Sequence, residues 1–446
     1  MYVYVGIPMA RFQDECVRIL ENRRTVVVLA AAISLAVLLF TEFCDHWGDI
    51  DHYYKNAGDV LDGLMPYSEA PFEYPPLSLV FMLIPRILSW DLSSFHFACA
   101  ILTYVFLVIG GYFLYRIADE YIGKRWQTGM IILCLLGFGS YFVIARNDVY
   151  PAVLSIIGLW LYLKKSYVPA FVVISLAALT KLYPAIFLIP MLIPFVMNRD
   201  WKNLAVSVLA VAAVGVLVEL PFILADPSTA FAYLSYHSDR GIQVESIASG
   251  FFMVYYLLVP SDITVVFNYG SDNLSGVGPD TLAPWMNSIM AAVMLLFIVV
   301  MVLRIRRSSA ARSNILPLMS LLCLAFLMLF ITFSKVYSAQ YYIWIMLMVP
   351  FTQFACFGEG HKREIIKLMV PFGIFTVLSY TAYLNLGLPS LNAVPILMVV
   401  LKNVFHILLT WAVVHMCWYE TRPDGCDHGD RAFSRIPFLN VGSSEE

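Results

Sequence analysis

Residues 25–77 join two stretches of opposite character, TVVVLAAAISLAVLLFTEF (25–43) and CDHWGDIDHYYKNAGDVLDGLMPYSEAPFEYPPL (44–77). The first stretch is apolar and close to the roughly 20 residues that cross a bilayer as one helix. The second is polar, aromatic and rich in carboxylates, namely Asp45, Asp49, Asp51, Asp59, Asp62, Glu69 and Glu73. This order predicts a membrane-spanning helix followed by a first outer loop over 44–93.

The composition of the whole chain supports a membrane protein. Of its 446 residues, 60% are hydrophobic and only 13% are charged, whereas a soluble domain carries about 25% charge. The apolar runs are continuous and lack the alternation of a β-barrel, which predicts an all-α polytopic membrane protein. A net charge of −3 does not indicate a nucleic-acid partner, and eight cysteines without a CxxC pair predict neither a disulfide framework nor a zinc site.

The apolar runs predict about twelve transmembrane helices. One stretch, 167–197, is interrupted by Lys181-Leu182-Tyr183-Pro184, and we interpret it as a hairpin of two short helices. The other predicted spans are 25–43, 94–117, 126–145, 148–163, 203–224, 284–303, 314–333, 340–357, 364–386 and 393–418. Together these segments form one transmembrane domain over 25–418.

The basic residues in short loops predict the orientation, because cytoplasmic loops carry an excess of Lys and Arg. A cytoplasmic N-terminal segment (1–24) and a cytoplasmic tail (419–446) place every basic cluster inside. This requires that 77–90 does not cross the membrane, so we expect a re-entrant or surface helix there. It also makes 226–283 a long outer segment.

In this orientation, four isolated cations face the same side as the acidic loop: Arg146, Lys181, Arg240 and Lys335. Charged groups near a bilayer are costly and usually serve a function. The pattern therefore predicts one external site. In an enzyme that uses a polyprenyl-phosphate sugar, Asp49 or Asp51 could deprotonate an acceptor hydroxyl. Arg146, Lys181 and Lys335 are suited to hold the donor phosphate.

Each of these residues also has a purely structural interpretation. Asp49 could cap the helix that follows it, and Arg146 could form an ion pair with Asp148. Lys181 and Lys335 could extend to the membrane interface. The aromatic residues Tyr53, Tyr67 and Tyr74 suit packing against sugar faces or lipid, or could belong to an interfacial belt.

The first outer loop resembles that of the GT-C mannosyltransferases that use polyprenyl-phosphate mannose. It is similar both to the bacterial family GT87 and to the catalytic subunit of GPI mannosyltransferase I. These proteins show an acid, an aromatic residue, a Gly, a Pro-Tyr pair and a Tyr-x-Pro-Leu segment. Here the pattern is filled by Asp49, Tyr53, Gly63, Pro66-Tyr67 and Tyr74-Pro75-Pro76-Leu77.

The spacing within this resemblance favours Asp49 as the catalytic acid. In the family the acid stands about four residues before the aromatic residue and about fourteen before the Gly, and Asp51 lies two residues too late for both. We keep Asp51 as the second candidate. The GPI enzyme has another acid two residues before the catalytic one, and Trp47 occupies that position here.

Three further blocks resemble the family in the same order: 145–148, 181–184 and 333–341 with Trp344. The resemblance implies contacts to substrate or lipid from residues in these blocks, namely Asn147, Asp148, Tyr183, Gln340 and Tyr341. In the first block the Asp follows the Asn directly, unlike the family's Arg-x-Asn-x-Asp pattern. Segment 226–283, the last spans and the tail carry no familiar pattern.

The resemblance implies an inverting hexosyltransferase of GT-C type, with mannose as the expected sugar. The donor would be a polyprenyl-phosphate sugar, and the acceptor a lipid-linked or glycan hydroxyl. Such enzymes mostly need no metal, although a divalent cation stays open as a cofactor, as does a small membrane partner subunit. The compact tail without a retention signal favours the cell membrane of a prokaryote over the endoplasmic reticulum membrane.

Two other classes of protein fit the composition. A secondary transporter should show paired broken helices, but only 180–184 is interrupted and the second half has no counterpart. A catalytically silent membrane subunit of a glycosylation complex would tolerate loss of Asp49.

Overall fold

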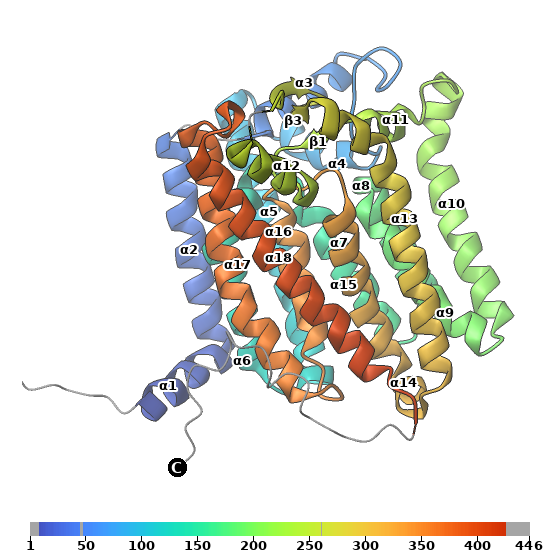
Figure 1. Cartoon of the computed structure of the whole chain (residues 1–446). Helices are drawn as coiled ribbons and strands as arrows, with labels where there is room; N and C mark the ends of the chain where they lie inside the picture. The colour runs from blue at the N-terminus through green and yellow to red at the C-terminus, as the bar shows by residue number, and fades with distance from the viewer. Residues whose placement is uncertain (1–8, 45–47, 260, 425–446) are drawn as a thin grey trace, which may run out of the picture.

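The computed structural model describes residues 9–44, 48–259 and 261–424. It is a bundle of helices with a cap of short elements at one end (Figure 1). Asp45 and Trp47 of the predicted first outer loop lie outside the described residues, as do residues 1–8 and the tail after residue 424.

Eight long helices coincide with eight of the predicted spans. They are α2 (Arg23–Cys44), α5 (Leu92–Ile117), α6 (Arg125–Ala145), α10 (Trp201–Ala225), α13 (Val277–Arg306), α15 (Ile315–Phe333), α17 (Glu359–Leu386) and α18 (Ala393–Glu420). By length and composition, seven helices of the described chain can cross a membrane, or eight if α1 (Met9–Glu21) and α2, bent by 86°, form one span. A π-helical turn, η1 (Ala118–Ile122), extends α5.

Shorter apolar helices occupy the remaining predicted spans. They are α7 (Val149–Leu163), α8 (Tyr167–Thr180), η2 (Tyr183–Phe187), α9 (Leu188–Met197), α16 (Tyr341–Met348) and η3 (Val349–Thr352). As predicted, the stretch 167–197 breaks at Lys181. At 15 residues, α7 rises about 22 Å, less than the roughly 30 Å of the hydrocarbon core. The total of about twelve crossings therefore stays a prediction.

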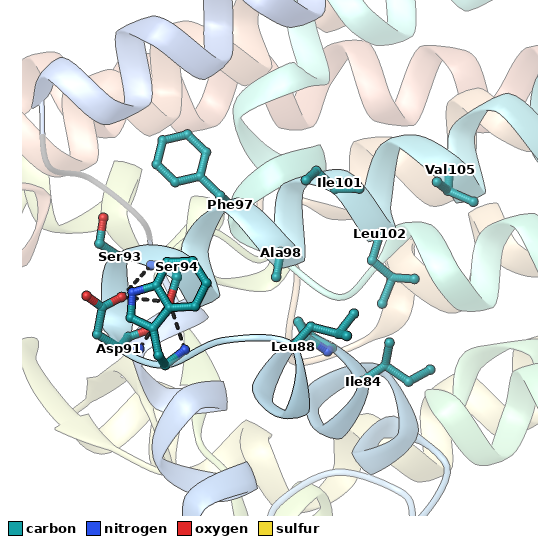
Figure 2. A pocket seen from close by; sticks show the side chains of 12 residues that line it. Ile84, Leu88, Asp91, Ser93, Ser94, Phe97, Ala98, Ile101, Leu102 and Val105 are labelled. Atoms are coloured by element: carbon teal, nitrogen blue, oxygen red, sulfur yellow. Dashed lines mark hydrogen bonds between the residues drawn. The ribbon is translucent and has the colours of Figure 1, made fainter.

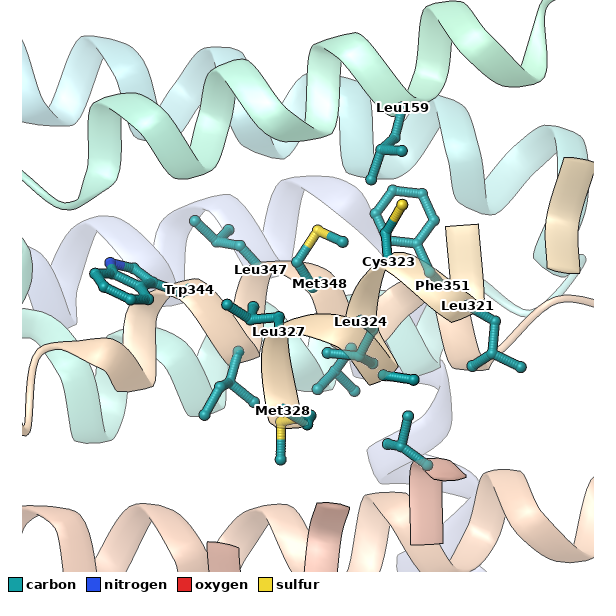
Figure 3. Close-up of a cluster of buried hydrophobic side chains, with 14 of the residues drawn as sticks. Leu159, Leu321, Cys323, Leu324, Leu327, Met328, Trp344, Leu347, Met348 and Phe351 are labelled. Carbon is teal, nitrogen blue, oxygen red and sulfur yellow. The ribbon is translucent and has the colours of Figure 1, made fainter. Parts of the chain in front are cut away.

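The hydrophobic core lies where α15 and α16 pack against α7. Nearly every residue from Leu318 to Leu329 is buried, as expected of a helix that is apolar on all sides and surrounded by others. Figure 3 shows this cluster, with Leu327 and Met328 of α15 beside Leu347 and Met348 of α16. In contrast, α10 at the edge of the bundle in Figure 1 has only two buried residues, Ser207 and Glu219.

The cap contains α3 (Ile50–Leu61), α4 (Ser78–Ile87), α11 (Ala232–Asp239), α12 (Ile247–Leu258) and a small antiparallel sheet. The sheet has the order β1 (Ile242–Gln243), β3 (Ser271–Ser275), β2 (Thr264–Asn268), with Leu274 opposite both Ile242 and Val265. Our interpretation of 226–283 did not include strands, because two to five residues are too few for a clear alternating pattern. The protein is otherwise helical, as predicted.

The opposite end of the bundle carries α1 and α14 (Ser309–Ser313) (Figure 1). The remaining short helix, η4 (Leu388–Ser390), connects α17 to α18. At the capped end, α4 rises only about 15 Å over its ten residues. It is therefore too short to cross the membrane alone, in agreement with a surface or re-entrant helix in the first outer loop.

Candidate active site

A polar cavity of about 170 Å³ lies in the cap, between the first loop, the small sheet and the ends of the central helices. Its wall contains four carboxylates, Asp49, Glu73, Glu245 and Asp272, and three cations, Arg146, Lys181 and Arg240. These residues come from five separate parts of the chain. The predicted gathering of acids and isolated cations in one place is thus observed for Asp49, Arg146, Lys181 and Arg240.

Gly48 allows the first loop to approach the end of α6 closely. It adopts the left-handed conformation with φ of +61°, and a Cβ atom at this position would lie 3.0 Å from the Cβ of Ala145. The backbone N–H of Asp49 donates to the carbonyl of Ala145 at 3.4 Å. The glycine therefore fixes Asp49 beside the C-terminal end of α6.

Asp49 stands at the N-cap of α3, but its side chain makes no capping hydrogen bond. Its carboxylate instead forms an ion pair with the guanidinium of Arg146. Tyr53, one turn later, is buried and also lines the cavity. Burial, together with the neighbouring carboxylate of Asp49, raises the pKa of Tyr53, so the phenol stays neutral and can donate a hydrogen bond.

Asp51 is separated from this site although it lies only two residues further along the chain. Its carboxylate is 2.7 Å from Nε2 of His96 on α5, and its side chain is 62% exposed. It does not line the cavity. Of the two candidate acids, only Asp49 therefore lines the cavity, and the spacing within the family resemblance favours the same residue.

Arg146 and Asp148 do not form the ion pair that we considered as a structural alternative. Asp148 is fully buried, and its Oδ1 accepts from Nζ of Lys181 at 2.7 Å and from Nε1 of Trp344 at 2.6 Å. Lys181 lines the cavity, whereas Asp148 lies behind it. Asp148 therefore positions Lys181, and Arg146 forms its ion pair with Asp49 instead.

Three aromatic rings stack beside this lysine. The ring of Trp344 lies between Tyr183, at a centroid distance of 4.0 Å, and Tyr341, at 3.6 Å. Nζ of Lys181 is 5.4 Å from the centroid of Trp344. Tyr341 and its neighbour Gln340 line the cavity, whereas Tyr183, on the other side of Trp344, is buried and does not line it.

The other predicted contact residues divide into two groups. Tyr74 lines the cavity and meets Tyr53 edge to face at a centroid distance of 5.7 Å. Tyr67 does not line it; it has a positive φ of 72° and donates to the carbonyl of Tyr74 at 2.6 Å. Asn147 is buried outside the wall, and its Nδ2 has no hydrogen-bond partner. Tyr67 and Asn147 therefore shape the surroundings rather than the cavity.

Lys335 is placed differently from the prediction that it binds phosphate directly. Its side chain is buried, does not line the cavity, and donates to the carbonyl of Ser238 at 2.5 Å, near the C-terminal end of α11 where cations are favoured. Burial lowers the pKa of this lysine; Asp239 opposes the shift and Arg240 adds to it. The Lys335 carbonyl accepts from the backbone N–H of Gln243 at 2.9 Å, so the residue joins two parts of the wall.

Several wall residues had no assigned role in the sequence. Arg240 had been recognised only as an isolated cation; its Nε donates to Oγ of Ser271 at 2.8 Å. Glu73 had been recognised only as one of the acids of the first loop. The others come from segments without a familiar pattern and include Tyr236, Gln243, Glu245, Asp272, Tyr380 and Tyr383. A usable signal was present in α17, where Tyr380 and Tyr383 place two phenols on one face of an otherwise apolar span. Over residues 9–44, 48–259 and 261–424, no group of three or more His, Cys, Asp or Glu is placed to hold a metal ion.

A second hollow lies between α4 and the first turns of α5 (Figure 2). It is apolar and its side chains include Ile84, Leu88, Phe97 and Ile101. Its single titratable residue, Asp91, caps α5 by accepting from the N–H of Ser94 at 2.8 Å. We call this hollow the apolar groove.

A model of glycosyltransferase family 87 matches residues 72–332. This segment holds 261 of the 446 residues, more than half of the chain. The chain belongs to glycosyltransferase family 87. The protein is therefore a multi-pass membrane glycosyltransferase, and its bundle of apolar helices agrees with that class.

The family 87 match covers most of the cavity wall. It includes Glu73, Arg146, Lys181, Arg240 and Glu245. Two parts of the wall lie beyond the matched segment: Asp49 and Tyr53 on the N-terminal side, and 338–341 with α17 on the C-terminal side.

Proposed function

We propose that this family 87 enzyme transfers a hexose, mannose in the first instance, from a polyprenyl phosphate to a hydroxyl of a lipid-linked or glycan acceptor. One observation carries the proposal: Asp49 and the cations Arg146 and Lys181 line one polar cavity in a membrane glycosyltransferase. A carboxylate and phosphate-binding cations are the two groups that this reaction needs.

In the proposed reaction, Asp49 acts as the general base. It takes the proton from the acceptor hydroxyl as the oxygen attacks the anomeric carbon, and the bond from that carbon to the phosphate oxygen breaks. A single in-line displacement inverts the configuration, so a β-linked donor gives an α-linked product. The ion pair between Asp49 and Arg146 keeps the carboxylate next to the cation that would receive the leaving phosphate.

The negative charge of the leaving phosphate is balanced by cations from three directions. Arg146 ends α6, Lys181 follows α8 and Arg240 follows α11. Arginine and lysine side chains in a partly buried wall stabilise developing phosphate charge better than in water. Lys335 contributes indirectly, because it fixes the end of α11 next to Arg240.

We also propose that the cavity faces the outer side of the membrane. The cluster Arg304, Arg306, Arg307 and Arg312 lies around α14, at the end of the bundle opposite the cap (Figure 1). The positive-inside rule then places the cap outside, and we favour the cell membrane of a prokaryote. Cysteines introduced singly at Asp51 and Ser309 should be labelled by an impermeant maleimide from the outer and inner side, respectively. Reversed labelling would refute this orientation.

Transfer itself is tested with the purified chain in lipid. We expect release of polyprenyl phosphate and labelling of an acceptor when the donor is radiolabelled polyprenyl-phosphate mannose. Donors carrying other hexoses and a panel of lipid and glycan acceptors define the specificity. Absence of transfer with every donor and acceptor, in protein that remains folded, would reject the proposal.

A further inference from the structure

Glu245 and Lys402 form a buried ion pair at the border between the cavity and the membrane bundle. Nζ of Lys402, on α18, lies 3.4 Å from Oε1 of Glu245 and donates to the Glu245 carbonyl at 3.2 Å. The exposed fraction is 0% for the lysine side chain and 6% for the glutamate side chain. The sequence pattern predicted no role for either residue.

Such a pair is poorly explained as a device for stability. Removing both charges from water costs about as much as their attraction returns, and an apolar replacement is often as stable. Ionisable residues inside a membrane domain generally mark a functional site. We therefore expect Glu245 to have a functional role at this position.

The surroundings hold the glutamate firmly in one place. Nζ of Lys402 lies 4.0 Å from the centroid of the Tyr337 ring, and Asn403 donates to the carbonyl of Ser246 at 2.9 Å. Gln243 accepts from the N–H of Tyr337 at 2.8 Å and donates to Oγ of Ser338 at 3.0 Å. Helix α18 and the 335–340 loop thus fix the segment that carries the carboxylate.

Glu245 lines the same cavity as the proposed catalytic groups. Arg146 and Tyr380 belong to the same wall, and the cavity that they share with Glu245 measures about 170 Å³. The glutamate is therefore close to the place where the donor phosphate would bind. An ionised carboxylate only accepts hydrogen bonds, and the hydroxyls of a sugar ring can supply them.

We infer that Glu245 accepts a hydrogen bond from a ring hydroxyl of the transferred hexose, and that Lys402 positions the carboxylate for this contact. The inference rests on the proposed function and adds a residue that selects the donor sugar. A site built to bind a hydroxyl discriminates against a substrate that lacks it, because its polar group is then left without a partner.

The test pairs a change in the enzyme with a change in the sugar. Wild-type enzyme and Glu245→Gln are assayed with polyprenyl-phosphate mannose and its 2-, 3-, 4- and 6-deoxy analogues. For the hydroxyl that Glu245 binds, removal should lower kcat/KM of the wild type by about 10- to 100-fold, and that of the variant by a smaller factor, because an amide oxygen accepts a weaker hydrogen bond than a carboxylate. If every analogue loses the same factor in both enzymes, the inference is wrong.

Two further variants separate recognition from folding. Glu219→Gln is a matched control, because Glu219 is buried and accepts a hydrogen bond from Tyr233 but does not line the cavity. The loss of kcat/KM with each deoxy analogue should be the same in this variant as in the wild type. Glu245→Gln/Lys402→Met removes both buried charges and should show the same lost discrimination as Glu245→Gln. Wild-type penalties in a folded double variant would contradict the inference.

The outcomes also distinguish this inference from the proposed function. Transfer by the wild type with equal penalties in all variants rejects the inference alone. No transfer from any polyprenyl-phosphate sugar by the folded wild type rejects both. Complete loss of transfer in folded Glu245→Gln, with activity kept in Asp49→Asn, would make Glu245 the base and overturn the recognition role.

Discussion

The polar cavity and the apolar groove differ in how the chain builds them. The cavity is lined by residues from Asp49 to Tyr383, whereas all residues of the groove lie between Ile84 and Val105. The cavity can hold four carboxylates because most of the charged groups in its wall have a partner, as in the pairs Asp49–Arg146 and Glu245–Lys402. The groove has one titratable residue, Asp91, which caps α5, and most of its other lining residues are apolar. Charged groups thus gather in this enzyme where distant segments of the chain converge.

The largest expected difference between the two regions concerns Asp49. Asp49→Asn should lower kcat by about 10²- to 10⁴-fold, because the proposed general base is lost while the shape of the side chain is kept. Asp51→Asn is the matched control on the same helix, and it should retain nearly full transfer since Asp51 contacts His96 outside the cavity. Both are measured as label transferred from polyprenyl-phosphate mannose. Full activity of Asp49→Asn would assign the base elsewhere.

A somewhat smaller loss is expected at Lys181. Lys181→Met should lower kcat by about 10²- to 10³-fold, because one of the cations proposed to hold the leaving phosphate is lost. Asp148→Asn should lose less, since the lysine stays but its ion pair at 2.7 Å becomes a weaker contact. Lys165→Met, on an exposed loop at the other end of α8, serves as the control. Equal activity of all three variants would contradict the proposed role of Lys181 in holding the leaving phosphate.

Lys335 should affect how stability depends on pH. Its pKa is lower in the folded state, so between that pKa and the ordinary value of about 10.4 the unfolded chain binds more protons than the folded chain. The contribution of Lys335 to the unfolding free energy should therefore rise with pH in this window. Thermal unfolding of the wild type and Lys335→Met should diverge in favour of the wild type as pH rises. Lys367→Met, at an exposed lysine paired with Glu364, is measured alongside as the control. A difference between the wild type and Lys335→Met that does not change with pH would contradict this expectation.

The smallest effects are expected in the apolar groove. Ile101→Ala should change kcat less than about twofold and stability by no more than about 0.5 kcal/mol, because the side chain is 65% exposed and offers no polar group. Transfer and thermal unfolding measured side by side check both values. A loss comparable to that of Lys181→Met would place chemistry in the groove.

The fold was largely predictable because a lipid environment imposes a simple rule. Each span needs a long apolar run, and the helices α5, α10 and α18 coincide with such runs to within a few residues. The small sheet was missed, since its strands of two to five residues are held by tertiary contacts rather than by a local pattern.

The site was predictable only in part. The spacing to Tyr53 and Gly63 selected Asp49 over Asp51, and the structure places only Asp49 in the cavity. Lys335 was expected in the wall because an isolated lysine shows its charge in the sequence but not the direction of its side chain. Glu245 was missed because its partner Lys402 lies 157 residues away.

Photo-crosslinking shows directly whether the donor sugar binds in the polar cavity. A polyprenyl-phosphate mannose with a diazirine on the sugar ring is irradiated with the wild-type enzyme in lipid, and the labelled peptides are identified by mass spectrometry. We predict labels on cavity segments, such as 240–245, 338–341 and 380–383, that unmodified donor displaces. Displaceable labels confined to the groove residues 84–105, with none in the cavity, would contradict the proposal that the donor sugar binds in the cavity.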